Sequence, residues 1–274
     1  MTPPEDASQQ STPPEPRPHT LAGDIRLHPA FHSRYLCARD VAVYLPPGYD
    51  PVEATRYPVL YLADGQNLFD QATAFGDEWH VDETAQSLIT AGTIQPLIIV
   101  GIHSAKERRL DEFTPTPRAD QGGGGFADDY GRMLIEEIKP FIDAHYNTLP
   151  SAASTGFGGS SLGALLALRL GVRYPTAIGK LALLSPSIWW DDRVILREVE
   201  SLAHKQPQRV WLDIGTAEGD EMLGDARRLR DVLVSKGWTE GDDLSYREID
   251  GGGHDEKSWG ARIGDVLAFL HPPR

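Results

Sequence analysis

The segment Gly159-Ser160-Ser161-Leu162-Gly163 places a serine at the centre of the pattern G-x-S-x-G. This pattern is typical of a sharp turn between a strand and a helix, on which the central serine is exposed as a nucleophile. Small residues are needed at the two glycine positions because backbones approach closely there. The residues after Ser161 can form an apolar helix whose N-terminus points free N–H groups at the serine. A glycine-rich turn without catalytic function is the alternative.

A serine nucleophile needs a general base, and the chain contains nine histidines. In folds with this turn the chain order is serine, acid, histidine. Only His204, His254 and His271 come after Ser161. His204 lies in a polar stretch and His271 in the C-terminal tail, whereas His254 follows the last predicted strand and three glycines. We therefore predict His254 as the base; the alternative is a solvated loop histidine.

The acid is expected after the preceding strand, where the candidates are Asp213, Glu218, Asp220 and Glu221. Asp213 lies within the predicted strand and can face either way. Asp220 and Glu221 suit the first turn of the next helix, where the helix dipole favours carboxylates. Glu218 comes first after the strand end. We predict that Glu218 orients His254 and stabilises its protonated form.

A tetrahedral intermediate needs backbone donors for its oxyanion. The N–H of Leu162, directly after the nucleophile, is one expected donor. The other is expected from the loop after an earlier central strand, where Gly65 and Gln66 follow Tyr57–Asp64. We predict the Gln66 N–H.

Side chains near these loops suggest a substrate pocket. Trp189 and Trp190 follow a predicted strand at the sheet edge where ligands bind in open α/β sheets, and Phe69 could join the same wall. Core packing is the alternative for the tryptophans. Arg109 could attract an anionic substrate at the rim of the site; the alternative is an arginine paired with Glu112 that fixes the loop.

Six apolar segments are predicted as strands, and a seventh, short strand precedes Ser161. The six are 40–49, 57–65, 96–102, 180–186, 209–215 and 244–253. Helical patterns alternate with them at 128–146, where Pro140 suggests a kink, and at 161–175, 225–237 and 259–271. Strands that are apolar on both faces and alternate with helices predict an α/β fold with a mostly parallel central sheet and helices on both faces.

The composition restricts the partners. The net charge of −14 disfavours binding to nucleic acid or to an anionic membrane, because both need a basic surface. The single cysteine, Cys37, excludes an intramolecular disulfide, and no metal-ligand motif such as H-E-x-x-H occurs, so we expect no metal and no cofactor. Residues 1–20 are rich in proline and polar residues and predict a disordered tail before one domain, 21–274. We expect a cytoplasmic protein; a homodimer is left open.

Beyond these features, a set of segments from residue 40 to residue 265 resembles the "putative esterase" family of α/β-hydrolases. These segments are VAVYLPPGY, YPVLYLADGQNLFD, IIVGI, RRLDEFTP, EEIKPFIDAHY, GGSSLGALLAL, LLSPSIWW, LDIGTAEGDE and GGGHDEKSWGAR. The family groups enterochelin-esterase-like siderophore hydrolases, feruloyl esterases, S-formylglutathione hydrolases and antigen 85 mycolyltransferases. The motifs DGQNLFD, EFTP and SPSIWW are most similar to the enterochelin-esterase-like branch.

The resemblance implies an α/β-hydrolase fold with Ser161, Glu218 and His254 as the triad and Gln66 and Leu162 as oxyanion donors. It implies a serine carboxylesterase that acts on a small-molecule ester, either siderophore-type or a small aromatic or acyl ester. A feruloyl-type carbohydrate esterase or an acyltransferase is the alternative, and a non-catalytic ligand-binding module is a remote one.

Overall fold

The computed structural model describes residues 17–273, so residues 1–16 of the predicted tail lie outside the described residues. Residues 17–20, which the sequence pattern assigns to this tail, form hydrogen bonds to the domain. The Arg17 guanidinium donates to the carbonyl of Gly76 at 2.7 Å, and the Thr20 hydroxyl donates to Glu78 at 2.5 Å. Residues 17–20 therefore pack against the domain.

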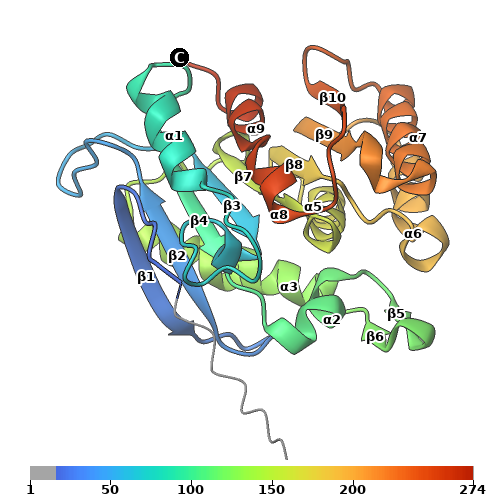
Figure 1. Ribbon diagram of the computed structural model, residues 1–274, viewed down its shortest axis with the longest axis horizontal. Coiled ribbons are helices and arrows are strands. Elements are labelled where there is room, and N and C mark those ends of the chain that lie inside the picture. Colours follow the sequence, from blue (N-terminus) through green and yellow to red (C-terminus); the bar gives the residue numbers. More distant parts are fainter. Residues whose placement is uncertain (1–16, 274) are drawn as a thin grey trace, which may run out of the picture.

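An eight-stranded sheet forms the centre of the molecule (Figure 1). Its strands are β1 (Asp24–Phe31), β2 (Arg39–Leu45), β3 (Val59–Ala63), β4 (Ile98–Ile102), β7 (Thr155–Ser160), β8 (Lys180–Leu184), β9 (Arg209–Gly215) and β10 (Leu244–Ile249). Their spatial order is β1-β2-β4-β3-β7-β8-β9-β10. Within this sheet, only the β1–β2 and β2–β4 pairs are antiparallel. The predicted α/β fold with a mostly parallel sheet is confirmed.

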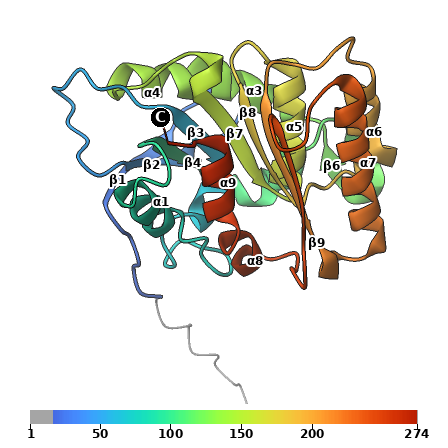
Figure 2. The same cartoon turned by 90° about the horizontal axis from the view of Figure 1, so that it is seen from above.

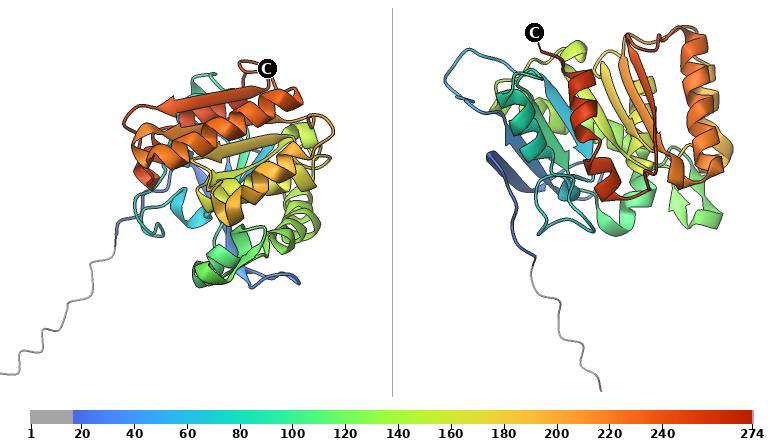
Figure 3. Two further views of the ribbon diagram at one scale, coloured as in Figure 1. Left: turned by 90° about the vertical axis from the view of Figure 1, so that its right-hand side faces the viewer. Right: turned by 45° about the horizontal axis from the view of Figure 1, so that its top comes forward.

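Helices cover both faces of this sheet. Helices α1 (Val81–Thr90) and α9 (Ile263–Leu270) lie side by side on one face (Figure 2). Helices α3 (Ala127–Met133), α4 (Lys139–His145) and α5 (Leu162–Arg173) contribute to the core on the other face. Helices α6 (Trp190–Glu200) and α7 (Asp220–Lys236) lie together beside β9 (Figure 3). Because both faces are covered, β3 and β4 are buried along their whole length.

The remaining elements are short. They include α2 (Arg109–Phe113), α8 (Glu256–Gly260), several 3₁₀ turns and a two-stranded ribbon of β5 (Pro117–Arg118) and β6 (Gly123–Gly124). In the described chain, no helix combines the length and apolar character needed to cross a lipid bilayer.

The pattern at 128–146 forms a continuous helical segment, in which a π-helical turn, Leu134–Ile138, joins α3 to α4. Pro140 directly follows this π-helical turn, and a π-helical turn is one of the irregularities that interrupt the regular hydrogen bonds of a helix. One helical prediction differs from the structure. The last predicted helix is divided into α8 and α9.

Candidate active site

Ser161 lies on a strained turn between β7 and α5. Its backbone angles are φ 57° and ψ −121°, a region that side chains other than glycine rarely adopt. A Cβ atom at Gly159 would lie 3.1 Å from the carbonyl carbon of Gly163, so close approach requires small residues at these two positions. The turn that the G-x-S-x-G pattern predicts is therefore present, with Ser161 at its apex.

A chain of hydrogen bonds joins Ser161, His254 and Glu218. Ser161 Oγ lies 2.9 Å from His254 Nε2, and His254 Nδ1 lies 2.7 Å from Glu218 Oε2. The serine follows β7, the acid ends a 3₁₀ turn after β9, and the histidine lies in the loop after β10. The Trp259 ring lies edge-on to the imidazole with centroids 4.9 Å apart. The structure thus brings together the three residues that the chain order suggests.

The Glu218 carboxylate is fully buried and has several partners. Its Oε1 atom accepts hydrogen bonds from the Gly215 N–H at 2.7 Å and from the Ser185 hydroxyl at 2.6 Å. The Arg262 guanidinium lies 3.9 Å away. A buried carboxylate needs such donors to remain charged. Glu218 is therefore held with its second oxygen toward His254.

The other candidate acids lie elsewhere. Asp220 and Glu221 occupy the first turn of α7, and Glu221 pairs with Arg193. Asp213 points into the protein, where it accepts a hydrogen bond from the Trp211 indole at 2.6 Å. Burial raises the pKa of Asp213 to about 6. None of the three forms a hydrogen bond to His254 in residues 17–273.

The other two histidines that follow Ser161 in the chain, His204 and His271, do not contact it. His204 is exposed in the loop between α6 and β9. His271 is completely buried beside the Lys180 ammonium, and burial holds its pKa well below the usual range. Neither contacts the serine.

The loop that carries Gln66 adjoins the serine turn. Strands β3 and β7 pair in parallel, so the residues after each strand meet at one edge of the sheet. A Cβ atom at Gly163 would lie 3.3 Å from Ala63 Cβ, which shows how closely the two turns pack. In the described part of the chain, the N–H groups of Gln66 and Leu162 have no hydrogen-bond acceptor. Both are free to donate to an oxyanion.

The chain also matches a known protein family. The family described as "Putative esterase" matches residues 33–270, which is most of the chain. The chain belongs to this esterase family.

Relatives and a solved structure agree with this family. The esterase is 28% identical to the uncharacterized protein YbbA of Bacillus subtilis over 92% of this chain and 97% of that protein. It is 29% identical to the ferri-bacillibactin esterase BesA of Bacillus subtilis over 79% of this chain and 80% of that one. A solved ferulic acid esterase superposes with a TM-score of 0.72 at 17% identity, covering 90% and 98% of the two chains, and therefore shares the α/β-hydrolase fold.

The structure corrects part of the predicted substrate pocket of the esterase. Trp190 has no exposed surface and donates a hydrogen bond to the carbonyl of Thr116 at 3.1 Å. Phe69 is 3% exposed and packs in the core on the α1 face. Neither ring can contact a substrate in this conformation, because the surrounding residues cover them. Trp189 is only partly buried and remains a pocket candidate.

Arg109 has a different partner from the expected one. Its guanidinium binds both carboxylate oxygens of Asp64, the shortest contact being 2.7 Å, while Glu112 pairs with Arg39. Burial alone would lower the pKa of Arg109, but the Asp64 carboxylate raises it. Arg109 therefore fixes the residue that precedes Gly65 and Gln66, and its charge is already neutralised by Asp64.

The structure adds four residues to the site that the sequence pattern does not indicate: Ser185, Ser187, Trp259 and Arg262. The hydroxyl of Ser187 lies 3.1 Å from Ser161 Oγ. Ser185 accepts hydrogen bonds from the Trp259 indole at 2.9 Å and from Arg262 at 3.1 Å while donating to Glu218. The one available signal was the position of Ser185-Pro186-Ser187 directly after β8, at the sheet edge that carries the other loops.

Proposed function

We propose that the esterase is a serine carboxylesterase that uses Ser161 as nucleophile, His254 as general base and Glu218 as the orienting acid. The observation that carries the proposal is the unbroken chain of hydrogen bonds from Ser161 Oγ through His254 to Glu218, at 2.9 and 2.7 Å. Both distances lie within the reach required for proton transfer and for orientation of the imidazole. A non-catalytic ligand-binding module would have no physical need for this arrangement.

In the proposed mechanism, Ser161 Oγ forms a bond to the ester carbonyl carbon while its proton moves to His254 Nε2. The N–H groups of Gln66 and Leu162 stabilise the negative oxygen. The tetrahedral intermediate collapses to an acyl-enzyme, and the leaving alcohol takes the proton from His254. Water then attacks the acyl group, gives a proton to His254 and releases the acid as Ser161 recovers its proton. No cofactor takes part in this sequence.

The proposed substrate is a small siderophore-type, aromatic or acyl ester. The resemblance of SPSIWW and DGQNLFD to the enterochelin-esterase-like branch and the relationship to BesA support a siderophore-type ester. A free, exposed cysteine such as Cys37 is typical of a reducing compartment and supports a cytoplasmic location. In that location the substrate would be a small diffusible ester. The neutralisation of Arg109 by Asp64 favours a neutral ester over a strongly anionic one.

The test of the catalytic proposal is hydrolysis of p-nitrophenyl butyrate by the unmodified chain, by Ser161→Ala and by Ser160→Ala. We expect Ser161→Ala to lose at least about 10³-fold in kcat/KM and Ser160→Ala to stay within about 10-fold, because only Ser161 touches His254. Equal rates for all three proteins would exclude Ser161 as the nucleophile.

The substrate class is tested by comparing kcat/KM for nitrophenyl esters of rising chain length, methyl ferulate and a catecholate trilactone. A preference for the trilactone would support the siderophore-type ester, whereas a preference for methyl ferulate would replace it with a feruloyl ester. Faster ester consumption on addition of alcohols or sugars would identify acyl transfer.

A further inference from the structure

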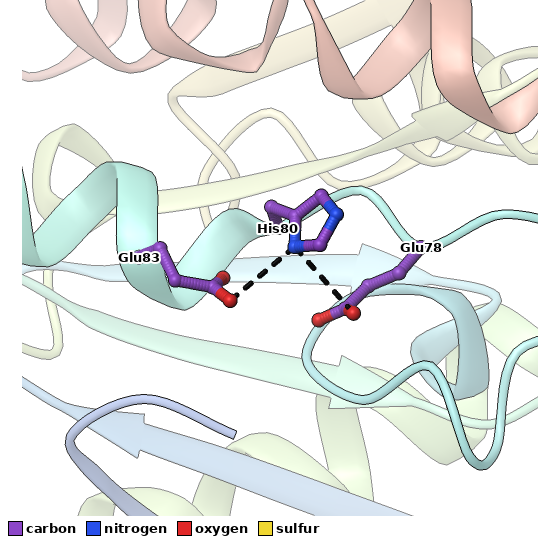
Figure 4. A group of neighbouring side chains, drawn as sticks. All are labelled: Glu78, His80 and Glu83. Carbon is purple, nitrogen blue, oxygen red and sulfur yellow. Dashed lines mark hydrogen bonds and ion pairs between the residues drawn. The ribbon is translucent and has the colours of Figure 1, made fainter. Parts of the chain in front are cut away.

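A second cluster of polar side chains lies at the start of α1, outside the proposed triad. Glu78 and His80 come from the loop before α1, and Glu83 comes from its first turn. His80 Nδ1 lies 3.5 Å from Glu78 Oε2 and 3.3 Å from Glu83 Oε1 (Figure 4). One nitrogen and two carboxylate oxygens of this cluster lie within 4.8 Å of one another. Ligands of one metal ion at distances of about 2.0–2.2 Å have similar mutual separations.

The Glu78 carboxylate lacks a partner for one of its oxygens. Glu78 is 2% exposed, and its Oε2 atom accepts a hydrogen bond from the Thr20 hydroxyl at 2.5 Å. Its Oε1 atom is buried and has no hydrogen-bond partner in residues 17–273. In Figure 4 this second oxygen lies on the side of Glu78 that faces Glu83. A buried carboxylate oxygen without a partner lowers the stability of the fold, so we expect a cation or a water molecule to bind this atom.

A further carboxylate, Asp82, lies beside Glu83 in the first turn of α1. Glu83 Oε2 and Asp82 Oδ1 are also buried without a hydrogen-bond partner in the described chain. Asp82 has no exposed surface, and its other oxygen accepts a hydrogen bond from the Ala22 N–H at 2.6 Å.

Among residues 17–273, no lysine or arginine forms an ion pair with these carboxylates. Lys257 lines the same surface hollow as Glu78 and His80 but does not pair with the cluster. His80 is half exposed, with 56% of its side-chain surface accessible, so the cluster can be reached from solvent. The net charge of −14 also favours uptake of a dication.

The ligand chemistry selects the kind of ion. Calcium and magnesium take oxygen ligands, whereas imidazole suits zinc and related transition metals, which also accept carboxylate oxygens. We propose that Glu78, His80 and Glu83 form a binding site for a divalent transition metal of the Zn²⁺ type. The spacing E-x-H-x-x-E differs from H-E-x-x-H, so the sequence pattern alone does not indicate a metal here.

A metal here would join the loop that follows β3 to α1. Between the two ligands from the loop, Trp79 donates its backbone N–H to the carbonyl of Asn67 at 2.9 Å. The Trp79 ring contacts the Trp259 ring, with centroids 6.0 Å apart, and Trp259 contacts His254. The proposed metal would therefore stabilise the loop after β3, which carries the expected oxyanion donor Gln66, and would take no part in the reaction itself.

The test is calorimetric titration of the metal-free full-length chain with Zn²⁺, with Mn²⁺ and Ca²⁺ as comparison ions. We expect one Zn²⁺ per chain, and at least about 10-fold weaker binding by His80→Gln and by Glu83→Gln. The matched controls are His204→Gln and Glu53→Gln, two exposed residues outside the cluster, which should bind as the unmodified chain does. Ser161→Ala should give the same isotherm, which separates this site from the proposed esterase mechanism.

Thermal unfolding gives a second readout. Without metal, Glu83→Gln should raise Tm, because it removes one of the crowded carboxylates; with saturating Zn²⁺ only chains with an intact cluster should gain Tm. This comparison remains decisive if His80→Gln fails to fold. The proposal is overturned if the chain binds no Zn²⁺ up to millimolar concentration, or if both cluster variants bind it as tightly as the controls do. A preference for Ca²⁺ that does not depend on His80 would also overturn it.

Discussion

Glu218 and His254 are 36 positions apart in the chain, yet Glu218 Oε2 lies 2.7 Å from His254 Nδ1. The contact forms because β9 and β10 are parallel neighbours, so the loops that follow them emerge at the same edge of the sheet. The acid is buried and the histidine is one-third exposed on its side chain. One end of the imidazole is thus fixed inside the protein while the other faces Ser161.

This relationship predicts the effect of Glu218→Gln. Glutamine keeps the shape of the side chain but cannot stabilise the protonated imidazole, so kcat should fall by about 10²–10⁴-fold with little change in KM. The measurement is steady-state hydrolysis of a nitrophenyl ester. Glu221→Gln, which alters a carboxylate in α7 outside the triad, should retain full activity. Equal activity of the two variants would assign the acid role to another group.

Ser185→Ala should reduce stability. Ser185 has no exposed surface, and its hydroxyl accepts from Trp259 and Arg262 while donating to Glu218. Its removal leaves buried donors without an acceptor, which costs about 1–3 kcal/mol in the free energy of unfolding. Denaturant unfolding measures this loss. The exposed Ser235→Ala on α7 should change stability by less than about 0.5 kcal/mol. A similar small change for Ser185→Ala would contradict the network.

Two glycine substitutions should act in opposite directions. A Cβ atom at Gly65 would lie 2.4 Å from the carbonyl carbon of Gly101 in β4. Gly65→Ala must therefore displace the loop after β3 that carries Gln66. We expect a loss of about 1–3 kcal/mol in stability together with a lower kcat. At Gly224 in α7, a Cβ atom would have no neighbour within 4 Å, and Gly224→Ala should gain about 0.5–1 kcal/mol. Thermal unfolding of both variants provides the check; a Gly65→Ala chain as stable as the unmodified one would contradict the close contact.

Asp213 should make stability depend on pH. Burial raises its pKa from 3.8 to about 6, although Arg262 at 3.5 Å opposes the shift. The folded state therefore holds this proton more tightly than the unfolded state, so the contribution of Asp213 to stability falls as the pH rises from about 4 to about 6. Relative to the unmodified chain, Asp213→Asn should gain at most about 3 kcal/mol across that interval and nothing further above it. Urea unfolding at several pH values measures the difference, and a constant difference would contradict a raised pKa.

The elements that the sequence predicts correctly are those with a strong local signal. Dense apolar segments become β3, β4, β8 and β9, because burial on both faces needs apolar side chains at every position. Strand β1 carries no such signal, since it is an edge strand with mostly exposed residues. Helix α1 also lacks a strong apolar signal, because few of its side chains are buried, although its acidic first turn is typical of a helix start.

The residues of the site likewise fall into those that the sequence predicts and those that it does not. The order of serine, acid and histidine along the chain is a property of the fold and can be read from the sequence. The partner of Arg109 cannot, because Asp64 and Glu112 are both available by type and only the packing of α2 against the loop after β3 selects Asp64. The burial of Trp190 under the ribbon residues near Thr116 is likewise a tertiary effect. Local patterns therefore indicated the candidate nucleophile, base and acid but not the supporting contacts.

The most direct test of the central claim is covalent labelling of the unmodified chain with diethyl p-nitrophenyl phosphate, followed by peptide mass spectrometry. The proposed mechanism predicts one diethylphosphoryl group per chain, located on Ser161, with loss of ester hydrolysis in proportion to labelling. Ser161→Ala should remain unlabelled, and Ser160→Ala should react as the unmodified chain does. Labelling of another residue, or equal labelling of Ser161→Ala, would contradict the assignment of Ser161 as the nucleophile.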